Sequence, residues 1–285
     1  MQPLQNKSKC AIIIVTHNSE RYLSHALDSL KNQTTPADQI IIVDSGSANT
    51  EYLLPFREQE NVTLALFKSN IGFCKGNNLG MSLLDRSCDY VLFLNPDAFL
   101  TPSFLEDAIK FMNHPDFKKC GAMTGTLLGY DIEIGKPSGK YDSTGIFNTW
   151  YGKWFDRDQG RECGAATYTI VETLPAICGA LMFFRKTALE AVMLDRNEVF
   201  DERFWMYKED IDLSCRLTTA GWKLLYNPMC IAYHCRGWNA RRAAVPRHFR
   251  LLSAKNELRL HLRLKSPVKV MYSAMKYLGV QVLDL

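Results

Sequence analysis

Residues 10–47 read CAIIIVTHNSERYLSHALDSLKNQTTPADQIIIVDSGS, and this stretch decides the fold of the chain. The continuous apolar runs at 10–16 and 39–43 are typical of strands that are buried on both faces of a parallel sheet. Between them, residues 20–32 place apolar side chains at helical spacing, which predicts an amphipathic helix. The stretch therefore predicts a β-α-β unit with a right-handed crossover.

The same alternation continues toward the middle of the chain. Strands are predicted at 62–67 and 90–94, with a helix at 73–84 between them. A helix over 102–112 follows, because Thr101 is a good N-cap and the next residue is proline. This order predicts an α/β fold with a Rossmann-like, doubly wound, mostly parallel sheet and helices on both faces.

Residues 129–171 interrupt the alternation. This segment is rich in Gly, Tyr, Trp and charged residues, and a compact domain rarely keeps a loop of this length without a use. The elements predicted beyond it are strands at 177–184, 223–226 and 230–234, and helices at 187–193 and 209–220. Gly221 is the expected C′ residue of the last of these helices.

The composition is that of an ordinary globular protein. The chain has 285 residues and a formal net charge of only +4 at pH 7, which gives no reason to expect nucleic-acid binding. No apolar run reaches the roughly 18–20 residues that a membrane-spanning helix needs. Residues 1–9 lack the apolar core of a signal peptide, and the nine cysteines lack metal-site spacing, which indicates reduced thiols. We therefore expect a cytoplasmic protein.

Two acidic residues directly follow predicted strands: Asp44 in VDSGS and Asp97 in NPD. Ligands of doubly wound sheets bind beyond the carboxyl ends of the strands, so both acids lie at the expected binding edge. Asp44 can accept hydrogen bonds from a base or a ribose, or it can cap its own turn. Asp97 can hold Mg²⁺ or Mn²⁺, or it can belong to an Asx-turn or a helix cap.

Three later features add to this set. Residues 70–80 (NIGFCKGNNLG) form a glycine-rich segment that can approach a phosphate or a base, or can simply make a tight turn. Residues 200–210 (FDERFWMYKED) place Glu209 and Asp210 at a predicted helix start, where a carboxylate can be a general base or a cap. His234 ends a predicted strand and can be a metal ligand or a structural residue.

Together these segments resemble the family-two inverting glycosyltransferases of GT-A fold, and bacterial rhamnosyltransferase-like members in particular. The similarity extends from about residue 11 to 234, in family order. The matching segments are IIIVTHNSERYLSHALDSLKNQ, IIIVDSGS, NIGFCKGNNLG, YVLFLNPDAFLTP, ICGALMFFRK, FDERFWMYKEDIDLSCRLTTAGWKLLYNP and the final YH. Asn95 replaces the first acid of the family's DxD pattern, and Asn49 replaces an Asp common after the DxGS turn.

The resemblance implies roles for individual residues. Asp97 would bind a divalent cation, Mn²⁺ or Mg²⁺, and Asp210 would be the catalytic base, supported by Glu209. His234 falls where some relatives place a metal-binding histidine. The residues expected to bind the nucleotide sugar are Thr16, Asn18, Asp44, Asn70, Gly72, Phe73, Asn77 and Asn95. Those expected to bind the acceptor are Trp150, Trp154 and Trp205, although the first two can also belong to a satellite hydrophobic cluster.

The resemblance divides the chain into a GT-A catalytic domain at 1–235 and a C-terminal region at 236–285. Within the domain, 1–127 would bind the nucleotide sugar and 128–235 the acceptor. The C-terminal region intersperses leucines with Arg and Lys, which predicts a basic amphipathic helical tail. Residues 241–277 can contact an anionic membrane peripherally, on the inner face of the cytoplasmic membrane, or can pack on the catalytic domain.

These features predict transfer of a sugar, with inversion, from a nucleoside-diphosphate donor to a hydroxyl of a glycan or lipid-linked glycan in bacterial surface polysaccharide synthesis. L-Rhamnose from dTDP-L-rhamnose is the expected donor; a UDP-hexose or UDP-galactofuranose is the alternative. Two other classes stay open. The first is a nucleotidyltransferase, which normally has a glycine-rich basic loop after the first strand; this chain lacks such a loop. The second is a non-catalytic nucleotide-sugar-binding protein. A homodimer is a further open arrangement.

Overall fold

A computed structural model describes residues 8–164, 168–235 and 245–283 of the chain. One large sheet contains β1 (Cys10–Thr16), β2 (Gln39–Asp44), β3 (Val62–Leu66), β4 (Tyr90–Leu94), β5 (Ala98–Leu100), β6 (Cys120–Asp131), β7 (Lys136–Ser143), β10 (Glu172–Thr173), β11 (Leu181–Arg185) and β12 (Lys223–His234). A separate hairpin pairs β8 (Ile146–Asn148) with β9 (Trp154–Asp156). The helices are α1 (Leu23–Lys31), α2 (Leu54–Arg57), α3 (Phe73–Ser82), α4 (Phe104–Asn113), α5 (Lys186–Glu190), α6 (Glu209–Thr219), α7 (Arg247–Arg263) and α8 (Pro267–Leu283).

The N-terminal half of the sheet is parallel, as predicted. Its strands run in the order β3-β2-β1-β4, and β1 pairs in parallel with both neighbours. Residues 10–14 of β1 are fully buried, as expected for a strand covered on both faces. The connection through α3 returns across the sheet in the opposite direction from those through α1 and α2, so right-handed crossovers place α3 on the other face. The first helix after β4 begins at Phe104 rather than at residue 102.

The other half of the sheet departs from the predicted pattern. β11 lies between β4 and β6 and is antiparallel to both, while β6, a strand that was not predicted, pairs in parallel with β12. β12 is one strand where two were predicted. Its register slips between Tyr226 and Ile231, where Pro228 has no N–H to donate to the ladder. The α/β fold is confirmed, with a mixed sheet built around a parallel half.

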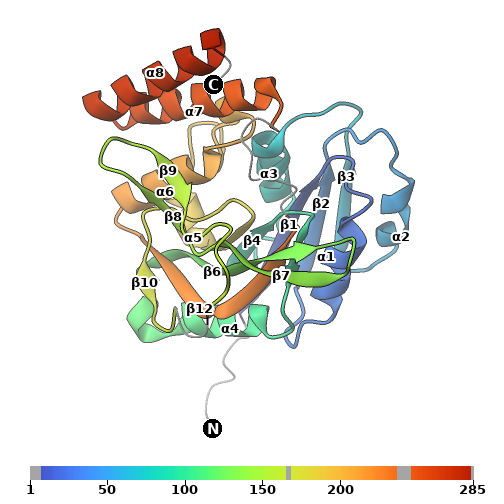
Figure 1. Ribbon diagram of the computed structural model, residues 1–285. Coiled ribbons are helices and arrows are strands. Elements are labelled where there is room, and N and C mark those ends of the chain that lie inside the picture. The colour runs from blue at the N-terminus through green and yellow to red at the C-terminus, as the bar shows by residue number, and fades with distance from the viewer. Residues whose placement is uncertain (1–7, 165–167, 236–244, 284–285) are drawn as a thin grey trace.

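The C-terminal region is a helical hairpin of α7 and α8, which lie side by side along one edge of the molecule with α8 outermost (Figure 1). The apolar side chains of α7 are distributed around the helix: Leu260 is fully buried, whereas Leu262 is exposed. The amphipathic face expected for this region therefore belongs to α8. Residues 241–244 of the predicted membrane contact lie outside the described residues. In the part of the chain that the structure describes, no helix is long and apolar enough to cross a bilayer.

Candidate active site

The loops after β1 and β2 are tied together by Asp44. This carboxylate is fully buried and accepts hydrogen bonds from the Thr16 hydroxyl at 3.0 Å and from the backbone N–H of Ser47 at 2.9 Å. Thr16 is fully buried as well. These contacts agree with the capping interpretation of Asp44, and they place both side chains beneath the candidate nucleotide surface.

Asn18 and Asn70 are exposed and join the neighbouring loops above Asp44. The Asn18 amide oxygen accepts from the backbone N–H of Ala48 at 2.8 Å. The Asn70 oxygen accepts from the Ser45 hydroxyl at 3.0 Å and from the Gly72 N–H at 2.9 Å. The carboxyl ends of β1, β2 and β3 therefore meet in one network of hydrogen bonds.

The glycine-rich segment 70–80 packs against the aromatic segment 200–208 that precedes Asp210. Gly72 has a φ of +82°, and a Cβ at this position would lie 2.3 Å from the Trp205 ring. The Cys74 N–H donates to the Trp205 carbonyl at 3.0 Å. Half-buried Phe73 packs edge-on against Phe200, with ring centroids 5.9 Å apart.

Asn77 differs from its neighbours in this segment. Its side chain is buried, and its amide donates to the Phe73 carbonyl at 3.0 Å, so it supports the start of α3. The next residue, Asn78, makes the long-range contacts: it exchanges hydrogen bonds of 2.8 Å and 2.9 Å with the Phe200 backbone. Asn78 therefore links α3 to the segment that contains Phe200, and the expected contact of Asn77 with the nucleotide sugar stays a prediction.

Asp97 and His234 meet where β5 pairs with the end of β12. The His234 Nε2 atom lies 3.2 Å from Asp97 Oδ1, and Nδ1 lies 2.8 Å from Asp142 Oδ2. Burial lowers the pKa of His234, but the charges and hydrogen bonds of the two carboxylates outweigh burial and raise it to about 9. The two carboxylates therefore favour a positive charge at this position.

Asp210 lies in the first turn of α6, at the same edge of the sheet. Its Oδ2 atom accepts from the Gly179 N–H at 3.0 Å, and its Oδ1 atom accepts from the Ile211 N–H at 2.8 Å. The residue after Gly179 accepts a 3.1 Å hydrogen bond from the backbone N–H of Asn95, two residues before Asp97. The Asp97 and Asp210 segments are thus connected by a hydrogen bond between the residue that follows β4 and the residue that precedes β11.

Glu209 and Asp210 form an acidic pair in a buried setting. Burial raises the pKa of Glu209 to about 8, and the charge of Asp210 adds to this effect. Burial also raises the pKa of Asp210, while Lys208 and two backbone N–H groups oppose the shift and Asp156 of β9 adds to it. One Glu209 oxygen, Oε2, has no hydrogen-bond partner. Burial and the neighbouring carboxylate therefore favour the protonated form of Glu209.

Comparison of the sequence with protein-family models classifies the chain. The model described as "Glycosyl transferase family 2" matches residues 11–193, more than half of the chain. The chain belongs to this family.

Relatives and a solved structure agree with that classification. This family 2 glycosyltransferase is 22% identical over 244 residues to the N-acetylglucosaminyl-diphospho-decaprenol L-rhamnosyltransferase of Mycobacterium tuberculosis, covering 81% of this chain and 77% of the relative. It is 25% identical over 249 residues to rhamnosyltransferase WbbL of Escherichia coli K12, covering 78% and 82%. GalNAc-T7, solved with UDP, GalNAc and Mn²⁺, superposes with a TM-score of 0.67 at 16% identity over 90% of this chain. The match covers 48% of the GalNAc-T7 chain, about half of its length, and shows the GT-A fold.

The chemistry of the Asp97–His234 pair fits a divalent cation. Two neighbouring ligands at about 2.1 Å from an octahedral ion lie about 3 Å apart, which is close to the 3.2 Å observed. A bound cation would replace the proton on Nε2 while Nδ1–H still donates to Asp142, the arrangement usual for metal-binding histidines. Within the described ranges, no three His, Cys, Asp or Glu side chains form a metal cluster. Two protein ligands would leave the other positions for phosphate oxygens and water.

The three tryptophans expected at the acceptor side have different surroundings. Trp205 packs on Gly72, in the loop that precedes Glu209 and Asp210, and Trp150 is 81% exposed at the tip of the β8–β9 hairpin. Trp154 does not fit its expected role, because its ring is buried under α7, where its N–H donates to His261 at 3.2 Å. Trp154 belongs to the main hydrophobic core, so the satellite-cluster alternative does not describe it either.

Asp142 is the residue of this site that the sequence did not single out. It begins the DSTGIF stretch, and a carboxylate next to the end of a strand is the only signal that could have pointed to it. Its role depends on the β6–β7 pairing, which brings it to His234.

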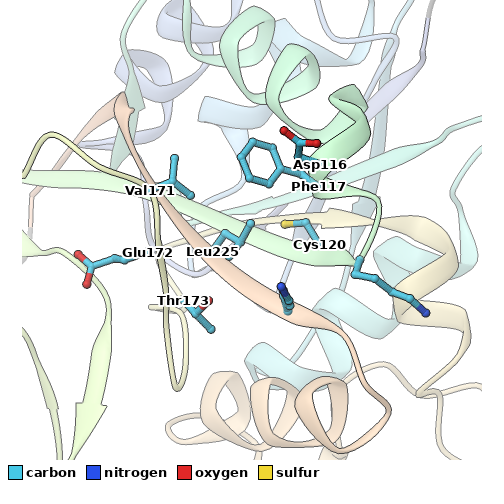
Figure 2. Close-up of a pocket in the computed structure, with 9 residues that line it drawn as sticks. Asp116, Phe117, Cys120, Val171, Glu172, Thr173 and Leu225 are labelled. Atoms are coloured by element: carbon cyan, nitrogen blue, oxygen red, sulfur yellow. The ribbon is translucent and has the colours of Figure 1, made fainter.

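A shallow pocket of about 250 Å³ lies elsewhere on the sheet (Figure 2). It is lined by Asp116, Phe117, Lys119, Cys120, Val171, Glu172, Thr173, Lys223 and Leu225. Cys120 and Lys223 begin β6 and β12, whereas His234 ends β12. This pocket is therefore separate from the candidate active site.

Proposed function

We propose that this glycosyltransferase transfers L-rhamnose from dTDP-L-rhamnose, with inversion, to a hydroxyl of a glycan or lipid-linked glycan in bacterial surface polysaccharide synthesis. The main support for this proposal is the position of three residues at one edge of the sheet. The Asp97–His234 pair lies there, and the Asn95 backbone hydrogen bond links it to the segment that holds Asp210. The two rhamnosyltransferase relatives, matched over most of their length, support the donor.

Asp97 and His234 would hold Mn²⁺ or Mg²⁺ at the donor diphosphate. The ion, when bound, neutralises the negative charge that develops on the leaving group. Asp142 would keep the imidazole oriented by holding the Nδ1 proton. Asn18, Asn70 and Phe73 would border the nucleotide at the ends of β1 and β3.

Asp210 would act as the general base. Its carboxylate takes the proton of the acceptor hydroxyl while the acceptor oxygen bonds to the anomeric carbon and the bond to the diphosphate breaks on the opposite side. This single displacement inverts the anomeric configuration. Glu209, whose pKa burial raises to about 8, would be protonated at neutral pH and leave the negative charge on Asp210.

The test is transfer from dTDP-L-rhamnose with Mn²⁺ to a lipid-linked N-acetylglucosamine acceptor, with the anomeric configuration of the product read by NMR. Asp210→Asn should abolish transfer and leave dTDP binding intact, whereas Asp28→Asn on the exposed side of α1 should change neither. EDTA should stop the reaction and Mn²⁺ should restore it. Product that retains the donor configuration, or full turnover by Asp210→Asn, contradicts the proposal.

The donor alternatives are separated without an acceptor. Because a ligand that binds only the folded state raises the melting temperature, nucleotide sugars can be ranked by thermal shift in the presence of Mn²⁺. We expect dTDP-L-rhamnose to stabilise more than UDP-glucose or UDP-galactofuranose. Stronger stabilisation by a UDP-sugar would reassign the donor and leave the reaction type unchanged.

We also propose that α8 rests on an anionic lipid surface, on the inner face of the cytoplasmic membrane, where a lipid-linked acceptor would be presented. Side chains at helical spacing form an exposed apolar stripe, which consists of Val268, Met271, Met275, Leu278 and Val282. α8 contains no acidic residue, and across 245–283 Glu257 is the only acid among eight Lys and Arg residues. A second copy would bring two basic surfaces together, whereas anionic lipid complements them.

Sedimentation with liposomes tests this contact. The chain should bind phosphatidylglycerol vesicles and not phosphatidylcholine vesicles, and the double change Met271→Glu with Met275→Glu should abolish binding. Met229→Glu, at a methionine on β12 that is even more exposed than Met271 and Met275, is the control. Equal binding by both variants contradicts the lipid contact, and a dimer that only the α8 variant loses would assign the stripe to a second copy.

A further inference from the structure

The five-residue loop 204–208 directly before the Glu209–Asp210 pair has an unusual backbone. Trp205, Tyr207 and Lys208 have φ values of +59°, +72° and +73°, in the region that residues with a Cβ rarely adopt. Such conformations persist only where the surroundings impose them. The position of Asp210 therefore depends on whatever holds this loop.

Asn256 of α7 holds the loop from outside the catalytic domain predicted from the sequence. Its side chain is fully buried. Its amide nitrogen lies 2.7 Å from the carbonyl oxygen of Phe204, 2.9 Å from that of Met206 and 3.0 Å from that of Tyr207. The two N–H groups of this one side chain are thus shared among three carbonyl groups of the loop.

Two arginines on the same face of α7 complete the contact. Residues 256, 259 and 263 are spaced by three and four, so they lie on one side of the helix. Arg259 donates to the Asn256 amide oxygen at 2.8 Å, which fixes the direction of the amide, and to the Arg203 carbonyl at 2.5 Å. Arg263 pairs with both Asp201 and Asp212, on either side of the loop.

We propose that Asn256 is a positioning residue for the Asp210 base, and that α7 is the brace which keeps loop 204–208 in its catalytic conformation. The part concerning Asp210 rests on the proposed function. In this arrangement the C-terminal hairpin belongs to the catalytic machinery, because the base keeps its place only while α7 is docked.

Hydrogen–deuterium exchange of Asn256→Ala is the test, with Lys255→Ala, an exposed neighbour on the same helix, as the control. Amides of 203–210 should exchange about tenfold faster in Asn256→Ala, the scale expected when buried hydrogen-bond groups lose their partner. Amides of β1 and β2 should be unchanged. Unchanged exchange in the loop, or an equal increase throughout the sheet, would overturn the proposal.

Kinetics provide the second readout. In Asn256→Ala, kcat should fall by about tenfold or more, while the Kd for dTDP with Mn²⁺ stays at the wild-type value. A merely structural role would weaken nucleotide binding and kcat together, which would also overturn the proposal. If wild-type protein transfers no sugar, the proposed function fails, and the exchange result still tests the brace.

Arg259→Gln keeps the proposal testable if Asn256→Ala does not fold. Arg259 is only half-buried, and the change removes the guanidinium that orients the Asn256 amide. The same loop amides should exchange faster than in wild type, again with β1 and β2 unchanged. Wild-type exchange in this variant would contradict the proposal.

Discussion

At the scale of single residues, the contact between Asp142 and His234 supports the candidate metal site. The 2.8 Å hydrogen bond from Nδ1 fixes both the imidazole ring and the nitrogen that faces Asp97. A residue that hydrogen-bonds to a metal-binding side chain sets the orientation and the basicity of that side chain. Its loss typically lowers metal affinity 10- to 100-fold.

Asp142→Asn should therefore weaken Mn²⁺ binding by about 10- to 100-fold, because the amide preserves the shape of the carboxylate without its charge. Isothermal titration of Mn²⁺ into protein saturated with dTDP measures this directly. Asp116→Asn, an exposed acid of the distant pocket, should leave the affinity unchanged. Wild-type affinity in Asp142→Asn would remove Asp142 from the site.

The raised pKa of Glu209, about 8, predicts a pH dependence of stability. Between pH 4.5 and about 8 the folded protein holds a proton that the unfolded chain has released. The free energy of unfolding should therefore decrease as the pH rises through this window, by at most about 1.4 kcal/mol per pH unit from this group.

Glu209→Gln should lose this contribution, so it should gain stability relative to wild type as the pH rises toward 8. Urea denaturation at pH 5, 6.5 and 8 measures the difference between the two curves. The exposed Glu190→Gln is the control. Parallel curves for wild type and Glu209→Gln would show that Glu209 titrates as an ordinary glutamate.

At the scale of elements, the sequence predicted what depends on local pattern. β1 and β4 lie at their predicted bounds because a continuous apolar run between polar residues permits little else. β6 was missed because its start, CGAMTGT, is rich in small residues and is identified as a strand only through its pairing with β11 and β12. Likewise, Asn256 carries no sequence signal, since its partners are backbone carbonyls about 50 residues away in sequence.

The approach of α3 to loop 204–208 depends on the absence of a side chain at Gly72. Gly72→Ala combines an unfavourable φ of +82° with a clash of the new methyl group against the Trp205 ring, 2.3 Å away. We expect a loss of about 1–3 kcal/mol in stability and weaker dTDP binding, read by urea denaturation and titration.

Gly160→Ala is the matched control, because its φ is +79° and nothing lies within 4 Å of a Cβ there. Gly160→Ala should lose only the stability that the unfavourable φ costs, and it should leave dTDP binding unchanged. If the two variants lost equal stability and bound dTDP equally, the contact with Trp205 would have no role.

At the scale of the whole molecule, the sheet edge and the C-terminal hairpin both contact the segment around Asp210. Asp97, His234 and Asp210 lie at one edge of the sheet, and Asn256 of α7 hydrogen-bonds to loop 204–208, which directly precedes α6 and Asp210. The division at residue 235 stays a prediction, and the contacts of Arg263 with Asp201 and Asp212 cross it. Acids at strand ends indicated the site from the sequence, whereas the brace requires the tertiary structure.

The most direct test of this account is the crystal structure of Asp210→Asn with dTDP-L-rhamnose and Mn²⁺, with manganese located by anomalous diffraction. We expect one manganese peak at about 2.2 Å from both Asp97 Oδ1 and His234 Nε2. It should contact the donor diphosphate, and the anomeric carbon should face residue 210. Manganese bound elsewhere, or a donor seated away from these residues, would contradict the account.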